Sequence, residues 1–108
     1  MFVRVKKRKS VRGPGQTTFN IVLVENYRSG GKVRQRHIKH LATINEYHAT
    51  LEHVLYRMFN EIETRLGEIN RHLDVESIIS EVERKLDVNR PTREQAEARV
   101  SQLWQELD

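Results

Sequence analysis

The hydrophobic period of this 108-residue chain changes once, near residue 43, and this change restricts the folds open to it. Before residue 43, apolar side chains tend to recur at every second position, as in strands that bury one face. After it they recur at steps of three or four, as along an amphipathic helix. A block of strands followed by a block of helices is typical of an α+β fold. We expect a small antiparallel sheet of about three strands, followed by two or three amphipathic helices.

The predicted strands are residues 2–5, 17–27 and 33–41. A Gly-Pro-Gly loop in residues 11–16 separates the first two strands, and Ser-Gly-Gly at residues 29–31 predicts a hairpin connection of three to five residues. The second strand has apolar side chains on both faces, which indicates the central strand of the sheet. In the third strand Val33 and Ile38 have opposite parity, so the sequence does not decide which of its faces meets the core.

The helical block begins with an apolar stripe over residues 44–73, long enough for about eight turns in one helix or for two shorter helices. Asp74 is expected to cap a helix whose inward side chains are Val75, Ile78, Ile79, Val82 and Leu86. Thr92 and Gln95 have the spacing of a capping box. The helix that follows is expected to turn these side chains inward: Ala96, Val100, Leu103, Trp104 and Leu107.

Charge divides the chain at the same place as the period. Residues 1–43 hold eleven Lys and Arg against a single acid, Glu25, which is a net charge of +10, whereas residues 44–108 carry a net charge of −6. Such an asymmetry indicates an anionic partner for the basic part. We therefore predict a basic β-sheet part that binds nucleic acid, residues 1–43, and an acidic helical part that forms oligomers, residues 44–108.

The basic side chains follow the strands in a useful pattern. Arg34 and Arg36 share one face of their strand about 7 Å apart, comparable to the distance between neighbouring phosphates, and Arg4, Lys6 and Arg8 share one face of the first strand. Two adjacent strands of this kind form a ribbon that fits the major groove of B-form DNA. The predicted contacts with duplex DNA are Arg4, Lys6, Lys7, Arg8, Lys9, Arg12, Arg28, Lys32, Arg34, Gln35, Arg36 and Lys39. Among them Arg34, Gln35 and Arg36 are the candidates for reading bases.

Three other interpretations remain open at this point. Residues 6–9 could instead protect an exposed strand edge, and the basic part could dock on an acidic partner, either the chain's own acidic half or another protein. An RNA-binding sheet is a third possibility, although only Tyr27 and Phe19 could supply aromatic platforms and the usual paired aromatic motif is missing. Tyr27 could stack on a base, but such a tyrosine more often packs on a cross-strand neighbour.

A chain with 37% hydrophobic and 31% charged residues is expected to bury further surface against a second copy of itself, as a homodimer or a higher homo-oligomer. The side chains predicted to form this interface are Leu51, Leu55, Phe59, Ile62, Leu66 and Trp104. A dimer would present two ribbons and suit a palindromic DNA site.

Several functional classes are not expected. The chain has no cysteine, which fits a reducing compartment, and it has no apolar run of the roughly 20 residues that a membrane span needs. The pairs His37/His40 and His48/His53 lack the companions of known zinc sites. No phosphate-binding glycine loop or catalytic constellation is present. We expect a cytoplasmic, non-enzymatic protein without metal, cofactor or small-molecule substrate.

The sequence of the first 43 residues resembles a known family. "MFVRVKKRK" and "VLVENYRSGGKVRQRHIKHL", residues 1–9 and 22–41, are similar to the N-terminal segment of DDE-type insertion-sequence transposases. The resemblance implies a DNA-contacting region. It departs from the family at Ala42, where a glycine is usual, and the family's nuclease core needs several hundred further residues. We therefore expect DNA binding without transposition, as in a small transcriptional or accessory regulator carried on a mobile element.

Overall fold

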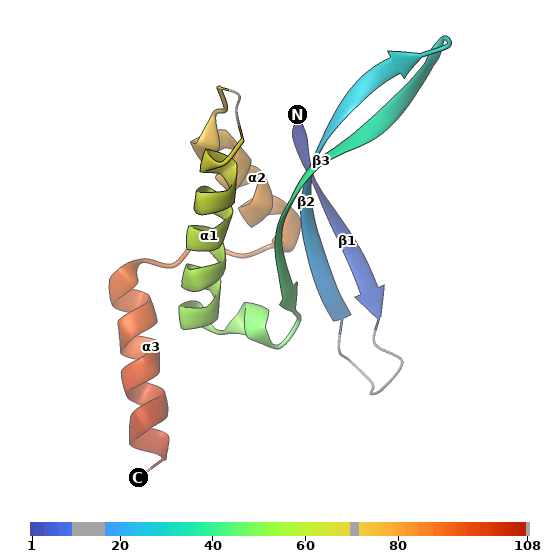
Figure 1. The fold of residues 1–108 in the computed structure, drawn as a ribbon. Coiled ribbons are helices and arrows are strands. Elements are labelled where there is room, and N and C mark those ends of the chain that lie inside the picture. The colour runs from blue at the N-terminus through green and yellow to red at the C-terminus, as the bar shows by residue number, and fades with distance from the viewer. Residues whose placement is uncertain (10–16, 70–71, 108) are drawn as a thin grey trace.

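The computed structural model describes residues 1–9, 17–69 and 72–107 and shows a sheet with helices packed on one side (Figure 1). The elements are β1 (Phe2–Lys9), β2 (Thr17–Ser29), β3 (Lys32–Asn45), a 3₁₀ turn η1 (His48–Thr50), α1 (Glu52–Gly67), α2 (Val75–Leu86) and α3 (Arg93–Glu106). The sheet is antiparallel with the order β1-β2-β3. The predicted α+β fold is confirmed, with three strands before three helices.

The strands are longer than predicted, and β3 continues to Asn45, past the expected boundary at residue 43. Ile44, which we placed at the start of the helical stripe, pairs with Phe19 of β2. The hairpin connection is also shorter than predicted. It consists of Gly30 and Gly31, whose φ angles of 58° and 79° are those of a two-residue turn that favours glycine.

One hydrophobic cluster joins the sheet to α1 and α2, so the basic strands and the acidic helices share a core. Its fully buried large side chains are Val3, Ile21, Leu23, Leu41, Phe59, Ile62 and Val82. Five of the six side chains predicted to form an oligomer interface are at most 8% exposed within this single chain: Leu51, Leu55, Phe59, Ile62 and Leu66. These side chains therefore pack inside the chain and leave no surface for a second copy.

The predicted helix caps are confirmed. The Asp74 carboxylate accepts the backbone N–H of Ser77 at 3.1 Å at the start of α2. Thr92 and Gln95 form a reciprocal capping box at the start of α3, with donor–acceptor distances of 2.9 and 3.2 Å. Both predictions depended only on local sequence.

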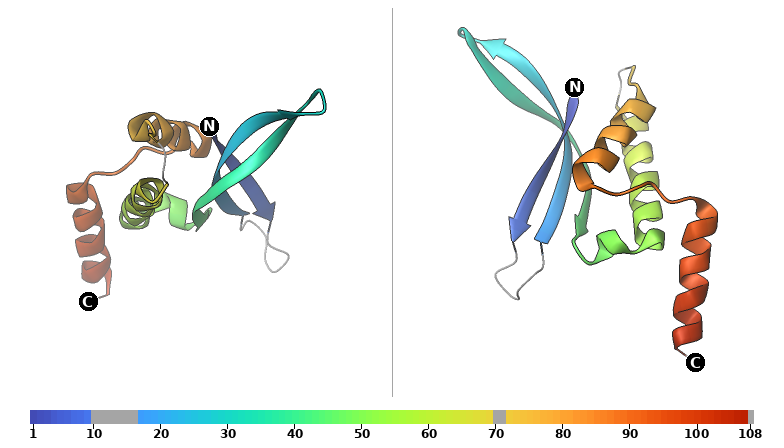
Figure 2. Two further views of the ribbon diagram at one scale, coloured as in Figure 1. Left: turned by 45° about the horizontal axis from the view of Figure 1, so that its top comes forward. Right: turned by 180° about the vertical axis from the view of Figure 1, so that it is seen from behind.

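The α3 helix packs on α1 and extends away from the sheet, as both views in Figure 2 show. Of its predicted inward side chains, Ala96 is buried, but Val100, Trp104 and Leu107 are 38%, 66% and 78% exposed. The inward orientation that we predicted for those three is wrong. Periodicity identifies an apolar face of a helix, but it does not tell whether anything covers that face.

Two bulges interrupt the pairing of β3 with β2, because the register skips Leu41 and Ile38. Leu41 and the adjacent Ala42 are 0% and 1% exposed, and Ile38 packs against the core. Bulges turn consecutive side chains toward one face and increase the local twist of the strand. Val33 and Ile38 have opposite parity for a simpler reason: Val33 is 63% exposed on the face away from the core, whereas Ile38 packs against it.

The β2–β3 hairpin continues past the end of the β1 ladder, which stops at the pair Phe2↔Val24. Beyond that point only two strands pair, from Glu25↔Arg36 to Ser29↔Lys32. We call residues 25–36 the arm. It projects away from the helices in every ribbon view (Figures 1 and 2).

Candidate nucleic-acid interface

The register assigns each basic side chain to one of two faces of the sheet, because antiparallel partners share a face. Val3, Ile21 and Leu23 belong to the core cluster and define the helix-side face. The basic residues in register with this face are Lys7, Lys9, Lys32, Arg34, Arg36 and Lys39. The opposite face, which we call the open face, carries Arg4, Lys6, Arg8 and Arg28.

This division changes the predicted ribbon. As predicted, Arg34 and Arg36 share a face, which is the helix-side face. Arg4, Lys6 and Arg8 of β1 share the open face instead. The strands β1 and β3 are also not adjacent, since β2 lies between them. The basic side chains therefore surround the arm and β1 rather than forming a single flat patch.

Most of the predicted DNA contacts are exposed. The cations among them that are exposed and form no ion pair with the described part of the chain are Arg4, Lys6, Lys7, Arg8, Lys9, Arg28, Lys32 and Arg34. Arg12 lies outside the described residues. Arg36 is partly engaged, because its Nη1 lies 3.5 Å from Glu25 Oε1 and its guanidinium carbon lies 4.5 Å from the centre of the Tyr27 ring.

Lys39 is tied to the helical part. Its Nζ pairs with Glu68 near the end of α1, and its side chain is 28% exposed. The hydrogen bond and charge of Lys39 lower the pKa of Glu68 from its ordinary value of 4.5. Lys39 thus serves the contact between β3 and α1, where its charge is already compensated.

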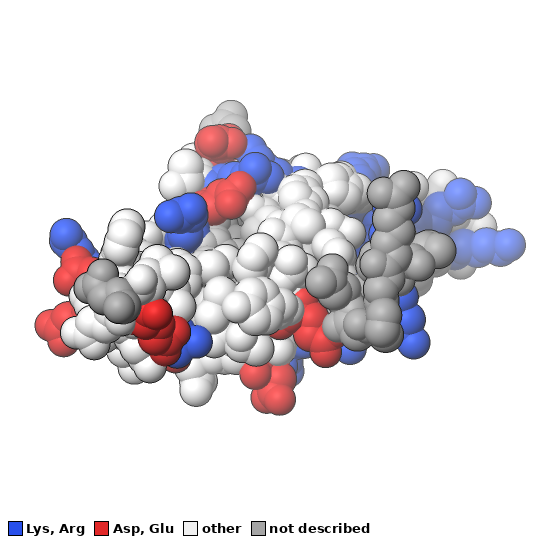
Figure 3. Space-filling view, turned by 90° about the horizontal axis from the view of Figure 1, so that it is seen from below, with Lys and Arg blue, Asp and Glu red and all other residues white. Residues whose placement is uncertain are grey.

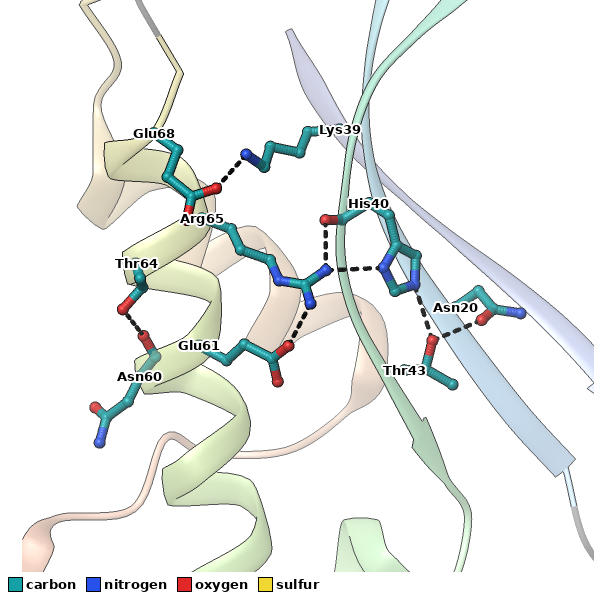
Figure 4. A network of polar contacts seen from close by, with 9 residues as sticks. All are labelled: Asn20, Lys39, His40, Thr43, Asn60, Glu61, Thr64, Arg65 and Glu68. Atoms are coloured by element: carbon teal, nitrogen blue, oxygen red, sulfur yellow. Dashed lines mark hydrogen bonds and ion pairs between the residues drawn. The ribbon is translucent and has the colours of Figure 1, made fainter.

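Arg65 of α1 starts a chain of hydrogen bonds to the open face (Figure 4). Its Nη1 donates to the backbone oxygen and to Nδ1 of His40, both at 3.1 Å, while its Nη2 lies 2.7 Å from Glu61. Arginine only donates, so His40 carries its hydrogen on Nε2 and donates it to Thr43 Oγ1 at 2.8 Å. Thr43 in turn donates to Asn20 Oδ1 at 2.8 Å, which links α1 to β3 and β2.

The edge of β1 is held in a comparable way by α2. The Val3 N–H donates to Glu81 Oε1 at 2.8 Å, and Lys85 donates to the Val3 backbone oxygen. Charged side chains therefore occupy backbone groups on both outer strands, Val3 on β1 and His40 on β3, which hinders pairing with other chains. Sequence reasoning missed Arg65, Glu81 and Lys85 because the i, i+4 spacing of the last two predicts only an ion pair along a helix.

Arg4 connects β1 to the arm. Its Nη1 donates to Gln35 Oε1 at 2.9 Å, passing over β2 on the open face. These two side chains also line a pocket of about 650 Å³ at the β1 edge, together with Lys7 and Lys85. The predicted contacts Arg4 and Gln35 thus meet in space although 31 residues separate them.

The charge asymmetry of the sequence is preserved in three dimensions. In Figure 3, acidic and basic side chains mix over the helical part on the left, whereas Lys and Arg dominate the far right, where the sheet lies.

Residues 1–9, 17–69 and 72–107 contain no group of three or more potential ligands that could hold a metal ion. In the same part of the chain, no helix has the length and apolar character needed to cross a membrane.

Comparison with known proteins identifies a family. Residues 3–87, from β1 to the end of α2, match the N-terminal domain of IS1634 family transposases. The match extends well past the 43 residues on which the resemblance rested, and α3 lies outside it. No curated protein and no solved structure matches the chain. Because the match covers most of the chain, the protein belongs to the IS1634 family transposases and contains their N-terminal domain, which connects it to a mobile element.

Proposed function

We propose that the chain binds duplex DNA through the arm and β1, as the DNA-contacting N-terminal domain of a transposase. The observation that carries this proposal is the arm itself, a two-stranded ribbon that extends past the helical body. Arg28, Lys32 and Arg34 are exposed on it without ion pairs to the described residues. A ribbon of this kind can enter the major groove, which is about 12 Å wide.

The cations of β1 supply the second half of the interface. Lys6, Lys7, Arg8 and Lys9 are exposed at the end of β1 that is remote from the arm. With the arm in the groove, these residues would reach phosphates further along the duplex. Phosphate contacts of this kind provide affinity and register but no sequence information.

The role we assign is binding rather than catalysis, because the matched region is a transposase N-terminal domain. Membership of this family also favours a role in the handling of a mobile element's own DNA over that of a free-standing transcriptional regulator. Such a protein would act in the cytoplasm, together with its DNA.

We further propose that the chain forms a homodimer through α3. Ala96, Val100, Leu103 and Leu107 follow the 4-3-4 spacing of a heptad seam, and Trp104 lies beside it. Val100 and Leu107 of this seam and the adjacent Trp104 are exposed in the single chain, whereas Ala96 is buried. Sedimentation at micromolar concentration tests the proposal, and a monomer at that concentration would exclude it.

Fluorescence anisotropy with a labelled random duplex, repeated at several salt concentrations, tests the main proposal. Binding to phosphates releases counterions, so we expect the logarithm of affinity to fall linearly with the logarithm of salt concentration. Single-stranded RNA at equal salt is the control for nucleic-acid type, and tighter binding to the RNA would contradict a duplex-DNA role. Absent or salt-independent binding would show that the basic part serves an acidic protein partner.

A further inference from the structure

The two faces of the arm carry different chemistry. On the open face, Asn26 pairs with Gln35 and Arg28 pairs with Val33. On the helix-side face the pairs are Glu25↔Arg36, Tyr27↔Arg34 and Ser29↔Lys32. All four open-face side chains are exposed, including Val33 at 63%. Val33 therefore contributes no burial to the hydrophobic core of this chain.

The open-face set contains the side chains that recognise base edges in the major groove. Asn and Gln form paired hydrogen bonds with adenine, Arg does so with guanine, and an apolar side chain contacts the thymine methyl group. Asn26, Arg28, Val33 and Gln35 occupy two successive cross-strand pairs, so they form one compact patch.

The helix-side face suits phosphates instead. Lys32 and Arg34 are exposed and have long side chains, and a lysine ammonium binds phosphate as a point charge without selecting a base. Arg36 on this face is already stacked on Tyr27 and paired with Glu25. Of the three predicted base readers, only Gln35 lies on the open face.

Charge also selects the side from which DNA approaches. The helix-side face looks toward α1, where Glu61 and Glu68 lie close to β3 (Figure 4). The open face carries the β1 residues Arg4, Lys6 and Arg8, and none of the paired strand residues in register with it is acidic. An approaching duplex therefore meets only cationic and neutral strand residues on the open face, whereas the other face of the sheet lies beside the helical body and its carboxylates (Figure 4).

We propose that Asn26, Arg28, Val33 and Gln35 on the open face of the arm read the base sequence of the target duplex. Lys32 and Arg34 on the opposite face then bind phosphates without sequence preference. Arg4 is a positioning residue, because its hydrogen bond to Gln35 Oε1 holds that amide in place. This inference rests on the proposed function, since it assigns roles within the same DNA-binding surface.

The experiment selects preferred sequences from a randomised duplex pool with the full chain, then measures affinity for a selected duplex and for random duplex. Asn26→Ala removes a predicted base contact without changing charge, and Ser29→Ala is the matched control on the other face of the arm. We expect Asn26→Ala to lower the ratio of selected to random affinity about tenfold, and Ser29→Ala to leave the ratio unchanged. Arg34→Gln should weaken binding to both duplexes equally.

The other outcomes separate the two proposals. A wild-type chain that binds no duplex overturns the proposed function and this assignment with it. Salt-dependent binding without enrichment of any sequence overturns only the base-reading assignment. The same holds if Asn26→Ala and Gln35→Ala both keep the wild-type ratio, or if Arg34→Gln lowers it. Thermal melting of each variant confirms that the chain is folded, because all the substituted positions are exposed.

Discussion

Replacing Arg34 and Lys39 separately by alanine distinguishes a free cation of the arm from one already compensated inside the chain. Arg34 is exposed and forms no ion pair with the described residues, whereas Lys39 is paired with Glu68 and its side chain is 28% exposed. Each phosphate contact contributes about 0.9 to the slope of log affinity against log salt. Arg34→Ala should therefore lower that slope by about 0.9, and Lys39→Ala should leave it nearly unchanged.

The assay is anisotropy with one random duplex between about 50 and 200 mM salt. Salt rises fourfold over this range, and the affinity of both proteins falls. With a slope difference of about 0.9, the fold-decrease for Arg34→Ala should be smaller than that of the wild type by a factor of about 3.5. Lys39→Ala serves as the matched control, since it removes the same unit of charge three residues beyond the end of the arm. Equal slope changes in the two variants would refute the reasoning, because the ion pair with Glu68 would then not have withdrawn Lys39 from the DNA.

The remaining predictions concern stability and assembly. Phe59→Ala should lower the free energy of unfolding by about 3–5 kcal/mol in a urea titration, since Phe59 is fully buried. Gly31→Ala should cost about 1–2 kcal/mol and lower the melting temperature, because Gly31 has a φ of 79°. The hydrogen bond from Arg90 lowers the pKa of Glu63 from 4.5. Their contact should therefore stabilise the fold above pH 4.5, and this stability should be lost as the pH falls through the lowered pKa. Glu63→Gln should not show this loss. Trp104→Ala should weaken self-association in sedimentation without lowering the melting temperature of the monomer.

Features that depend on a few neighbouring residues could be predicted from the sequence. The Asp74 cap and the capping box of α3 follow from side chains three residues apart, whatever the rest of the chain does. The inward stripe of α2 follows in the same way, with Ile78, Ile79 and Val82 buried. The three-strand order was predictable because short connections join neighbouring strands.

Features that depend on what packs against an element could not be predicted. An apolar stripe is the same in sequence whether a sheet covers it, as at Phe59, or solvent surrounds it, as at Trp104. Ile44 fitted the helical period although it belongs to β3, because one apolar residue at the end of a strand satisfies both periods. Likewise, nothing local shows that Glu81 reaches the edge of β1.

The sequence shows which basic and polar side chains belong to the candidate site, but not which face of the sheet each side chain occupies. The pairing of β2 decides the face. Ile21 and Leu23 belong to the core cluster shared with α1 and α2. No bulge interrupts the alternation of β2 itself, so every second residue of that strand is in register with the helix-side face, out to the tip of the arm. Asn26 and Arg28 must then lie on the opposite face.

The Gly30–Gly31 turn carries this orientation across to β3. It pairs Ser29 with Lys32, which sets Val33 opposite Arg28 and Gln35 opposite Asn26. Since a shift of one residue in pairing reverses the face of every side chain, a two-residue turn and a buried β2 leave one arrangement for the arm. The bulges at Ile38 and Leu41 come after that arrangement is set, so they can turn extra apolar side chains into the core without disturbing it. The core side chains Ile21 and Leu23 thereby decide which side chains of the arm share the open face.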